Sequence, residues 1–343
     1  MADAQPPAAA VDNDFETRTR HFFDLINDGN IQQLRVLIDS LDANELNILL
    51  RRTVDPVERD TRTGSALWSA IFRLHSDIID LLLEKGADPN EPTLGALNNR
   101  RTNMTPLFFA VNNALLPLCR LLVARGANLD LGTDFAITPL MHACNKSQME
   151  IVTFLVENGA DINLQHGDGA TALMAACYRG NVDIVRLLLS HGAIVEQADY
   201  DGMFPLMNAA MGGHLEVCRL LVEEWAADVN QQTIEHVDPL MGAACQGHLA
   251  VVVFLIENGA DLQHVDVEGY NALIWAVQKR KTEVARHLVA IGAGIDQRNR
   301  AGKSARDLAE ESGNAEMMAI FHAADNGRHA EGTDGQQNEQ QQM

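Results

Sequence analysis

Apolar residues in this chain recur at i, i+3 and i+4 in pairs of short segments, and the pairs repeat about every 33 residues. One leucine marks each copy, with intervals of 40, 33, 33, 33, 34 and 33 residues: Leu67, Leu107, Leu140, Leu173, Leu206, Leu240 and Leu273. The i, i+3, i+4 spacing predicts a helix for each segment. A single helix pair cannot bury its own apolar face, so the repeat predicts an all-α stack of helix pairs.

Residues 137–163 show the signals that begin and end the helices of one copy. Thr138 and Pro139 begin the first helix, because a hydroxyl can cap it and proline suits its first turn. A polar break at 145–148 separates it from a second helix. Gly159 ends that helix, since glycine tolerates the left-handed conformation.

These motifs resemble the ankyrin-repeat family over residues 60 to 321, about three quarters of the chain. The residues that carry the resemblance are Thr-Pro-Leu at 105–107 and 138–140, Gly-His at 213–214 and 247–248, and Gly-Ala-Asp-Ile-Asn at 159–163. The resemblance implies a curved solenoid of helix-turn-helix units joined by β-turn fingers, with degenerate N- and C-terminal caps. It also implies a chain that binds other proteins and is not an enzyme.

The repeat divides the chain into five expected segments. They are a disordered N-terminal segment (1–14), a helical N-terminal cap (15–59), seven repeats (60–298), a C-terminal capping repeat (299–324) and a disordered Gln-rich tail (325–343). Phe22 takes the leucine position in the N-terminal cap. Charged residues replace apolar ones in the C-terminal cap, as an end repeat without a neighbour requires.

Two departures from the repeat mark candidate recognition loops. Seven extra residues near 91–103 predict a longer finger that carries Arg100 and Arg101. In the 34-residue copy Trp225 is the extra residue and Ala226 takes the glycine position. Loops that vary on a rigid scaffold are suited to recognition, and neutral drift in an exposed loop is the alternative explanation.

Several recurring residues are expected to serve packing. An apolar column replaces the family's usual histidine, at Trp68, Phe108, Met141, Met174, Met207, Met241 and Ile274. Four of the five cysteines also fall at two shared repeat positions, so we expect buried thiols and no metal site. His214 and His248 are expected to cap the outer helices or contact turns.

Net charge narrows the classes of partner. The formal charge is −21, from 26 basic and 47 acidic residues. This charge disfavours nucleic acid and anionic membranes, which need clustered lysine and arginine. It is compatible with a basic partner, although solubility alone could explain it. An odd cysteine number, without a visible secretory signal or membrane span, predicts a reducing compartment, the cytoplasm or also the nucleus. We also expect a monomer.

The binding surface is expected on the finger tips and on the inner helices just before each polar break. The candidate contact residues are Phe72, Arg73, Lys146, Tyr178, Arg179, Tyr200, Met203, Met211, Trp225 and Tyr270. All three tyrosines of the chain are among them, and tyrosine and arginine often anchor interfaces. Tyr178, Arg179, Tyr200, Met203 and Met211 lie in adjacent copies and could form one patch. Turn packing is the alternative role for the tyrosines.

No motif for catalysis or for a cofactor is visible: there is no phosphate-binding glycine loop, nucleophile elbow or His-Glu-x-x-His. We therefore expect a protein-binding adaptor or scaffold. An assembly chaperone or stoichiometric inhibitor is the first alternative, and an enzyme subunit is the second. The family resemblance also implies Asn163 as a site of hydroxylation, because Leu155 to Asn163 fits the family's Leu-x5-Asp-Ile/Val-Asn form.

Overall fold

The computed structural model describes residues 13–52, 65–97 and 100–323. These residues form two compact units, one up to Pro139 and one from Leu140 onward. The two terminal segments that were expected to be disordered lie outside the described residues, apart from Asn13 and Asp14. Helix α1 already begins at Asn13, two residues before the boundary expected from the sequence.

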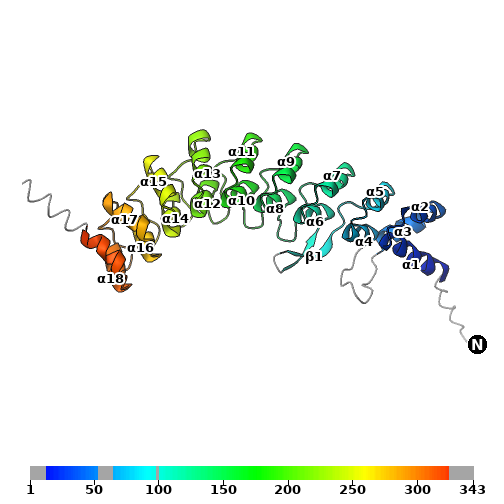
Figure 1. The fold of residues 1–343 in the computed structure, drawn as a ribbon, viewed down its shortest axis with the longest axis horizontal. Helices are drawn as coiled ribbons and strands as arrows, with labels where there is room; N and C mark the ends of the chain where they lie inside the picture. The colour runs from blue at the N-terminus through cyan, green and yellow to red at the C-terminus, as the bar shows by residue number, and fades with distance from the viewer. Residues whose placement is uncertain (1–12, 53–64, 98–99, 324–343) are drawn as a thin grey trace, which may run out of the picture. The chain divides into compact units, whose positions relative to one another are not determined.

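The first unit contains the helices before the second leucine-marked repeat and that repeat itself (Figure 1). Its helices are α1 (Asn13–Asn27), α2 (Ile31–Ser40), α3 (Ala43–Arg51), α4 (Ala66–Arg73), α5 (Ser76–Glu84), α6 (Pro106–Asn112) and α7 (Leu116–Ala124). Phe22 is fully buried in α1, at the register of Leu67 in α4. Helix α3 is an extra element between the first helix pair and α4. An Asp42–Glu45 capping box begins it.

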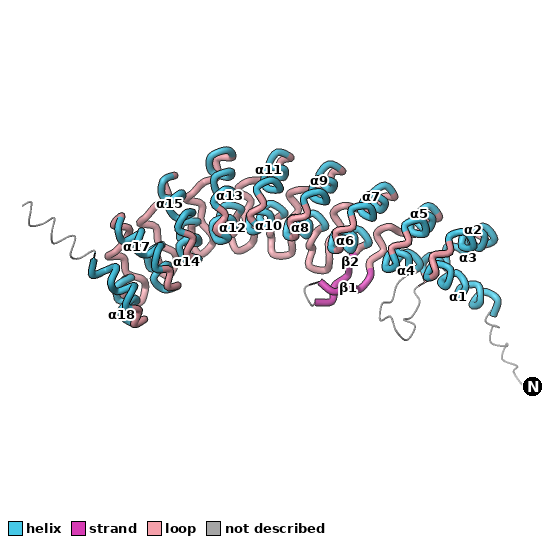
Figure 2. Tube along the Cα trace, in the orientation of Figure 1, coloured by secondary structure: helices cyan, strands magenta, loops and turns pink. Residues whose placement is uncertain are grey.

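The inserted finger of the first unit is a β-hairpin (Figure 2). Strands β1 (Thr93–Leu97) and β2 (Arg100–Met104) pair antiparallel with Thr93 opposite Met104. The Asp134 carboxylate joins the hairpin to the next finger. It accepts hydrogen bonds from the backbone N–H and the side-chain amide of Asn103, at 2.8 and 3.0 Å. The hairpin is thus the one sheet among the described residues of an otherwise all-α fold.

The second unit repeats one helix pair along the chain, with inner helices packed on inner helices (Figure 1). Its inner helices are α8 (Pro139–Asn145), α10 (Ala172–Arg179), α12 (Pro205–Gly212), α14 (Pro239–Gln246), α16 (Ala272–Gln278) and α18 (Ala305–Glu311). Its outer helices are α9 (Met149–Glu157), α11 (Val182–Ser190), α13 (Leu215–Arg219) continued by η1 (Leu220–Glu224), α15 (Leu249–Glu257) and α17 (Thr282–Ala290). Residues 315–323 form a last helix after α18.

Both predicted apolar columns are buried. The repeat leucines are at most 1% exposed, and the column at Trp68, Phe108, Met141, Met174, Met207, Met241 and Ile274 is at most 6% exposed. The packing role predicted for that column is therefore confirmed. All five cysteines are free thiols, and four of them, Cys119, Cys144, Cys177 and Cys218, are buried.

The expectation that Trp225 is the extra residue of the 34-residue copy is wrong, because the added residue lies within the outer helix and Trp225 takes the place that His191 and Asn258 hold after their helices. The α13–η1 segment spans ten residues, whereas α11 and α15 span nine each. Residues 220–224 form a π-helical turn, which accommodates one added residue without changing the helix ends. Trp225 follows this turn, and Ala226 adopts φ of 53° at the position held by glycine in other copies.

The histidines of the Gly-His motifs link successive repeats. The Nε2 of His214 donates to the Tyr178 carbonyl at 2.8 Å, and that of His248 donates to the Met211 carbonyl at 3.0 Å. Neither side chain caps its own helix. Of the two roles expected for these histidines, capping of their own helix is wrong. Each ring contacts the turn of the preceding copy, where it lies against a glycine and its N–H donates to a carbonyl at the end of an inner helix.

Each inner helix ends in a residue with positive φ. Glycine serves at Gly180, Gly213 and Gly247, whereas Ser147 does so at φ of 55°. A residue with a Cβ is strained there by about 1–2 kcal/mol, so we expect Ser147→Gly to raise the free energy of unfolding by about 1 kcal/mol. Urea denaturation measures this change. An equal gain from Ser190→Gly, in the last turn of helix α11, would show that the conformation at Ser147 is not the cause.

Candidate functional site

The fingers of the second unit are joined to one another by backbone hydrogen bonds. The N–H of Tyr200 donates to the Asp168 carbonyl at 3.0 Å, and that of Ile234 donates to the Asp201 carbonyl at 3.3 Å. The next finger continues the series with a 3.1 Å bond from Val267 to Glu235. The fingers therefore form a continuous edge whose side chains keep one register from copy to copy.

Met203 is held in place by the turn of its own finger. The Asp199 carboxylate accepts hydrogen bonds from the N–H groups of Asp201 and Met203, at 3.0 and 2.7 Å. Gly202, at φ of 78°, lets the chain reverse between them. This local sequence places Met203 two residues before helix α12, which carries Met207 and Met211 about one and two turns further on.

The three methionines line a pocket of about 350 Å³ between two fingers and helix α12. Its lining residues are Asp201, Met203, Met207, Met211, Thr233, Ile234, Glu235 and Val237. Met207 is fully buried and forms part of the wall from below, whereas Met203 and Met211 are half-buried. Thioether side chains are flexible and polarisable, so such a pocket can adapt to an apolar side chain of a partner.

Gly242 keeps space for these methionines. A Cβ at this position in helix α14 would lie 2.8 Å from the Met207 sulfur and 3.1 Å from Cγ of Met211. Glycine within a helix costs about 1 kcal/mol relative to alanine, and no unusual φ requires it here. The pocket therefore depends on a residue that weakens its own helix.

An aromatic pair lies one repeat beyond the pocket. The rings of Tyr270 and Trp275 are 5.2 Å apart, and the indole N–H of Trp275 donates to the buried carboxylate of Asp266 at 2.9 Å. The Lys279 ammonium lies 5.7 Å from the Trp275 ring, within range of a cation–π contact. Sequence reasoning found Tyr270 but missed Trp275. Its repeat position could have indicated it, since Trp275 takes in α16 the position of Gly242 in α14.

The structure brings together part of the predicted contact set. Met203 and Met211 line one pocket, and Tyr200, which is 69% exposed, lies on the same finger as Met203. Tyr178 is 53% exposed on α10. Arg179 donates from Nε to the side-chain oxygen of Asn145 at 2.9 Å and so is held against the preceding inner helix.

The other predicted contact residues lie elsewhere. Phe72 and Arg73 belong to helix α4 of the first unit, where Phe72 packs with Trp68 and Phe109 at ring distances of 5.3 and 5.6 Å. Trp225 follows the outer-helix segment, whereas the pocket is built from fingers and inner helices. Lys146 is an exposed residue at the end of α8.

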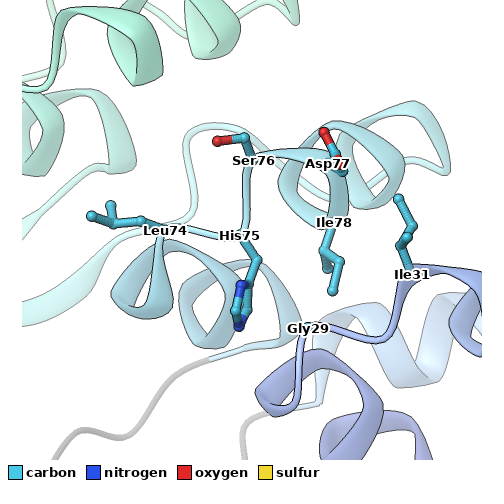
Figure 3. A pocket seen from close by; sticks show the side chains of 7 residues that line it. All are labelled: Gly29, Ile31, Leu74, His75, Ser76, Asp77 and Ile78. Atoms are coloured by element: carbon cyan, nitrogen blue, oxygen red, sulfur yellow. The ribbon is translucent and has the colours of Figure 1, made fainter.

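A second pocket, of about 320 Å³, lies in the first unit (Figure 3). The imidazole of His75 forms one side of it and lies against Gly29, where a Cβ would come within 2.9 Å of the ring. The same glycine–histidine contact occurs at His214 and His248 in the second unit. We therefore interpret this pocket as a hollow beside a packing contact that the fold uses repeatedly.

The described residues offer little for catalysis or metal binding. Among them, no cluster of three or more histidine, cysteine, aspartate or glutamate side chains could hold a metal ion. Burial lowers the pKa of His142 to about 4 and raises that of Cys144, so that both are neutral at pH 7. No described helix has the length and hydrophobicity needed to span a membrane.

Comparison with known proteins identifies the repeat. A family model described as ankyrin repeats in three copies matches residues 92–166, 160–233 and 240–330. The chain belongs to the ankyrin-repeat family. Ankyrin repeats are protein-interaction modules, and the all-α ankyrin solenoid expected from the sequence is confirmed. No curated protein sequence matches the chain.

Among solved structures, the ankyrin repeat domain of human ASB11 resembles this ankyrin protein. The two share 28% sequence identity with a TM-score of 0.59, over 64% of this chain and 98% of that one. The similarity is therefore to one ankyrin domain that is shorter than this chain.

Asn163 bridges two ankyrin turns. Its side-chain amide donates to the Gly192 carbonyl at 3.0 Å and accepts from the Ile194 N–H at 3.1 Å, and Asn230 makes the same kind of bridge to the next turn. We expect Asn163→Ala to lower the free energy of unfolding by about 1–2 kcal/mol, because both bonds are lost. Hydrogen exchange at Ile194 measures the effect, and unchanged protection there would contradict it.

Hydroxylation of Asn163 stays a prediction. Both hydrogen bonds of its side chain use the terminal amide, so the Cβ atom takes no part in the bridge. Mass spectrometry of the protein from cells that contain the hydroxylase tests it. An unmodified Asn163 would contradict it.

Proposed function

We propose that this ankyrin protein is a non-catalytic adaptor or scaffold that holds a segment of a partner protein against its second unit. The observation that carries the proposal is the pocket where Met203, Met207 and Met211 meet two fingers. It lies where ankyrin geometry exposes variable side chains on a rigid scaffold. It also offers the adaptable apolar surface that peptide-binding proteins use.

Exposed aromatic and aliphatic side chains extend this surface. Tyr200 and Ile234 occupy the same register in adjacent fingers and are 69% and 65% exposed. Side chains of this size, exposed next to an apolar pocket, are typical of interfaces. Tyr178 and Tyr270 belong to the same proposed surface from α10 and from the finger before α16.

Gly242→Ala separates binding from folding. The added methyl group crowds Met207 and Met211 into the pocket, so we expect partner binding to weaken at least tenfold. The free energy of unfolding should change by less than about 1 kcal/mol, because the gain in helix propensity offsets the crowding. Quantitative affinity purification with mass spectrometry measures the first effect, and urea denaturation measures the second.

Two further variants complete this experiment. Ala290→Ser adds one atom on the exposed side of outer helix α17 and should leave every partner bound. Tyr178→Ala/Tyr200→Ala should release the same partner as Gly242→Ala. A partner retained at full yield by Gly242→Ala, with the fold intact, would contradict the proposal. If the released partner is later found in a mature complex without this chain, the role is that of a chaperone.

A further inference from the structure

Two carboxylates on the rim of the methionine pocket form no ion pair with any residue that the structure describes. Asp201 and Glu235 line the pocket and are exposed. The equivalent carboxylates of the flanking fingers have partners: Asp168 accepts a hydrogen bond from the His166 imidazole at 2.7 Å, and Glu268 forms an ion pair with Arg300 at 3.3 Å. The unpaired carboxylates therefore coincide with the two fingers that line the pocket.

Negative charge without a local counterion favours a cationic ligand. The chain carries −21 overall, so that neighbouring charges add to the same potential and draw cations to the surface. A phosphate or an acidic peptide would meet repulsion at both rim positions. A lysine or arginine would instead find carboxylates that none of the described side chains pairs with.

The apolar floor requires a second feature of the ligand. Met203, Met207, Met211 and Val237 line the space below the carboxylates, and its volume of about 350 Å³ is roughly ten times that of a water molecule. A polar side chain would make no favourable apolar contact with these residues. A large apolar side chain would bury them, and the flexible thioethers would adjust to its shape.

The repeat spacing suggests the order of these features. Asp201 and Glu235 occupy the same place in adjacent fingers, and packed inner helices lie about 8–10 Å apart. An extended chain advances about 3.3 Å per residue and points alternate side chains to the same face. Two cations four residues apart, about 13 Å, therefore share one face with the residue midway between them, and their long side chains can reach both carboxylates. The apolar side chain then falls between them.

We propose that this pocket binds an extended segment of a partner protein in which one large apolar side chain is flanked by two lysine or arginine side chains. The proposal rests on the proposed function and specifies its partner chemistry. Asp201 and Glu235 receive the two cations, Met203 and Met211 enclose the apolar side chain, and the buried Met207 supports them from below. The methionines give tolerance for its shape, and the carboxylates give the selection for charge.

The test uses the full chain labelled with ¹³C at its methionine methyl groups. Single Met→Leu variants assign the signals of Met203, Met207 and Met211 among the 12 methionines. Three pools of short synthetic peptides are titrated: basic with a central apolar residue, acidic with the same apolar residue, and basic with serine in its place. We expect only the first pool to shift the three signals, with weaker binding as salt is added.

Charge variants identify the acceptors. Asp201→Asn/Glu235→Gln should weaken binding of the basic apolar pool roughly tenfold, because two exposed ion pairs are lost. The matched control Glu216→Gln/Glu257→Gln removes the same charge from outer helices α13 and α15 and should have little effect. Circular dichroism verifies that both double variants are folded.

Several outcomes would overturn the inference. Equal shifts with the acidic apolar pool would show that the pocket binds peptides without the proposed charge selection, so that only this inference fails. Equal shifts with the serine pool would show that binding does not require the central apolar side chain. Peptide-free signals that change with protein concentration would identify a second copy as the occupant. Absence of shifts with every pool would refute this peptide chemistry, whereas partner release by Gly242→Ala tests the proposed function independently.

Discussion

Gly213→Ala is expected to lower the free energy of unfolding by roughly 3 kcal/mol. Gly213 has φ of 75°, where an alanine is strained by about 1–2 kcal/mol. Its Cβ would also collide with the imidazole of His248. The ring would have to move away from the Met211 carbonyl, and the 3.0 Å hydrogen bond that links two repeats would be lost, at about 1 kcal/mol.

Gly192→Ala is the matched control for this prediction. Gly192 has φ of 93°, and no atom lies within 4 Å of a Cβ built there. Alanine should therefore cost only the backbone strain of about 1–2 kcal/mol. Urea denaturation gives both values, and hydrogen exchange at the ends of α12 and α14 locates the change. Equal losses from the two substitutions would show that His248 contributes nothing to the link between repeats.

The second large effect concerns pH, because two buried groups of the second unit titrate in opposite senses. Burial, with Lys146 nearby, lowers the pKa of His142 to about 4 from an ordinary 6.5. Burial also raises the pKa of Asp238 to about 6 from 3.8, although this carboxylate caps α14 through the Met241 N–H at 2.8 Å. Both side chains are only 2% exposed.

The signs follow from which state binds more protons. Between pH 4 and 6.5 the unfolded chain protonates His142 more than the native state does, so stability is lost as pH falls. Between pH 3.8 and 6 the native state protonates Asp238 more than the unfolded chain does, so stability is lost as pH rises. Each shift of two or more pH units corresponds to about 3 kcal/mol, so the two contributions nearly cancel between pH 4 and 6.

Replacing either His142 or Asp238 should therefore expose the pH dependence of stability that the other residue causes. Asp238→Thr keeps a capping hydroxyl, as Thr171 does for α10, and should lose about 3 kcal/mol relative to wild type when pH falls from 7 to 4. His142→Asn should gain a similar amount relative to wild type over the same interval. Urea denaturation at a series of pH values measures both. Parallel curves for wild type and Asp238→Thr would show that Asp238 titrates normally in the native state.

Part of the candidate surface could be predicted from the positions of its residues within the repeat. Met203 and Met211 were predicted contacts because the repeat places them at a finger and at the end of an inner helix, and the structure puts both on one pocket. Trp275 was missed because its register, at the position of Gly242, places it on the inner helix but does not indicate that its indole contacts a finger. Its bond to Asp266 exists only once the finger and the helix are folded together.

The sequence by itself determined the repeat, its all-α class and the residues that are buried. Periodicity is sufficient for these because each helix pair buries the same face against an equivalent neighbour, so that one position has one environment in every copy. The left-handed residues that end inner helices could also be predicted from local sequence, since a glycine marks them at Gly180, Gly213 and Gly247.

Only the tertiary structure decided what differs between equivalent positions. Gly242 opens a pocket because Met207 and Met211 approach it from the preceding repeat, and His248 bonds to a carbonyl of that repeat and does not cap its own helix. No described cation pairs with Asp201 or Glu235, whereas Asp168 and Glu268 each have a partner. Such contacts depend on distances between side chains from different repeats, and periodicity carries no information about those distances.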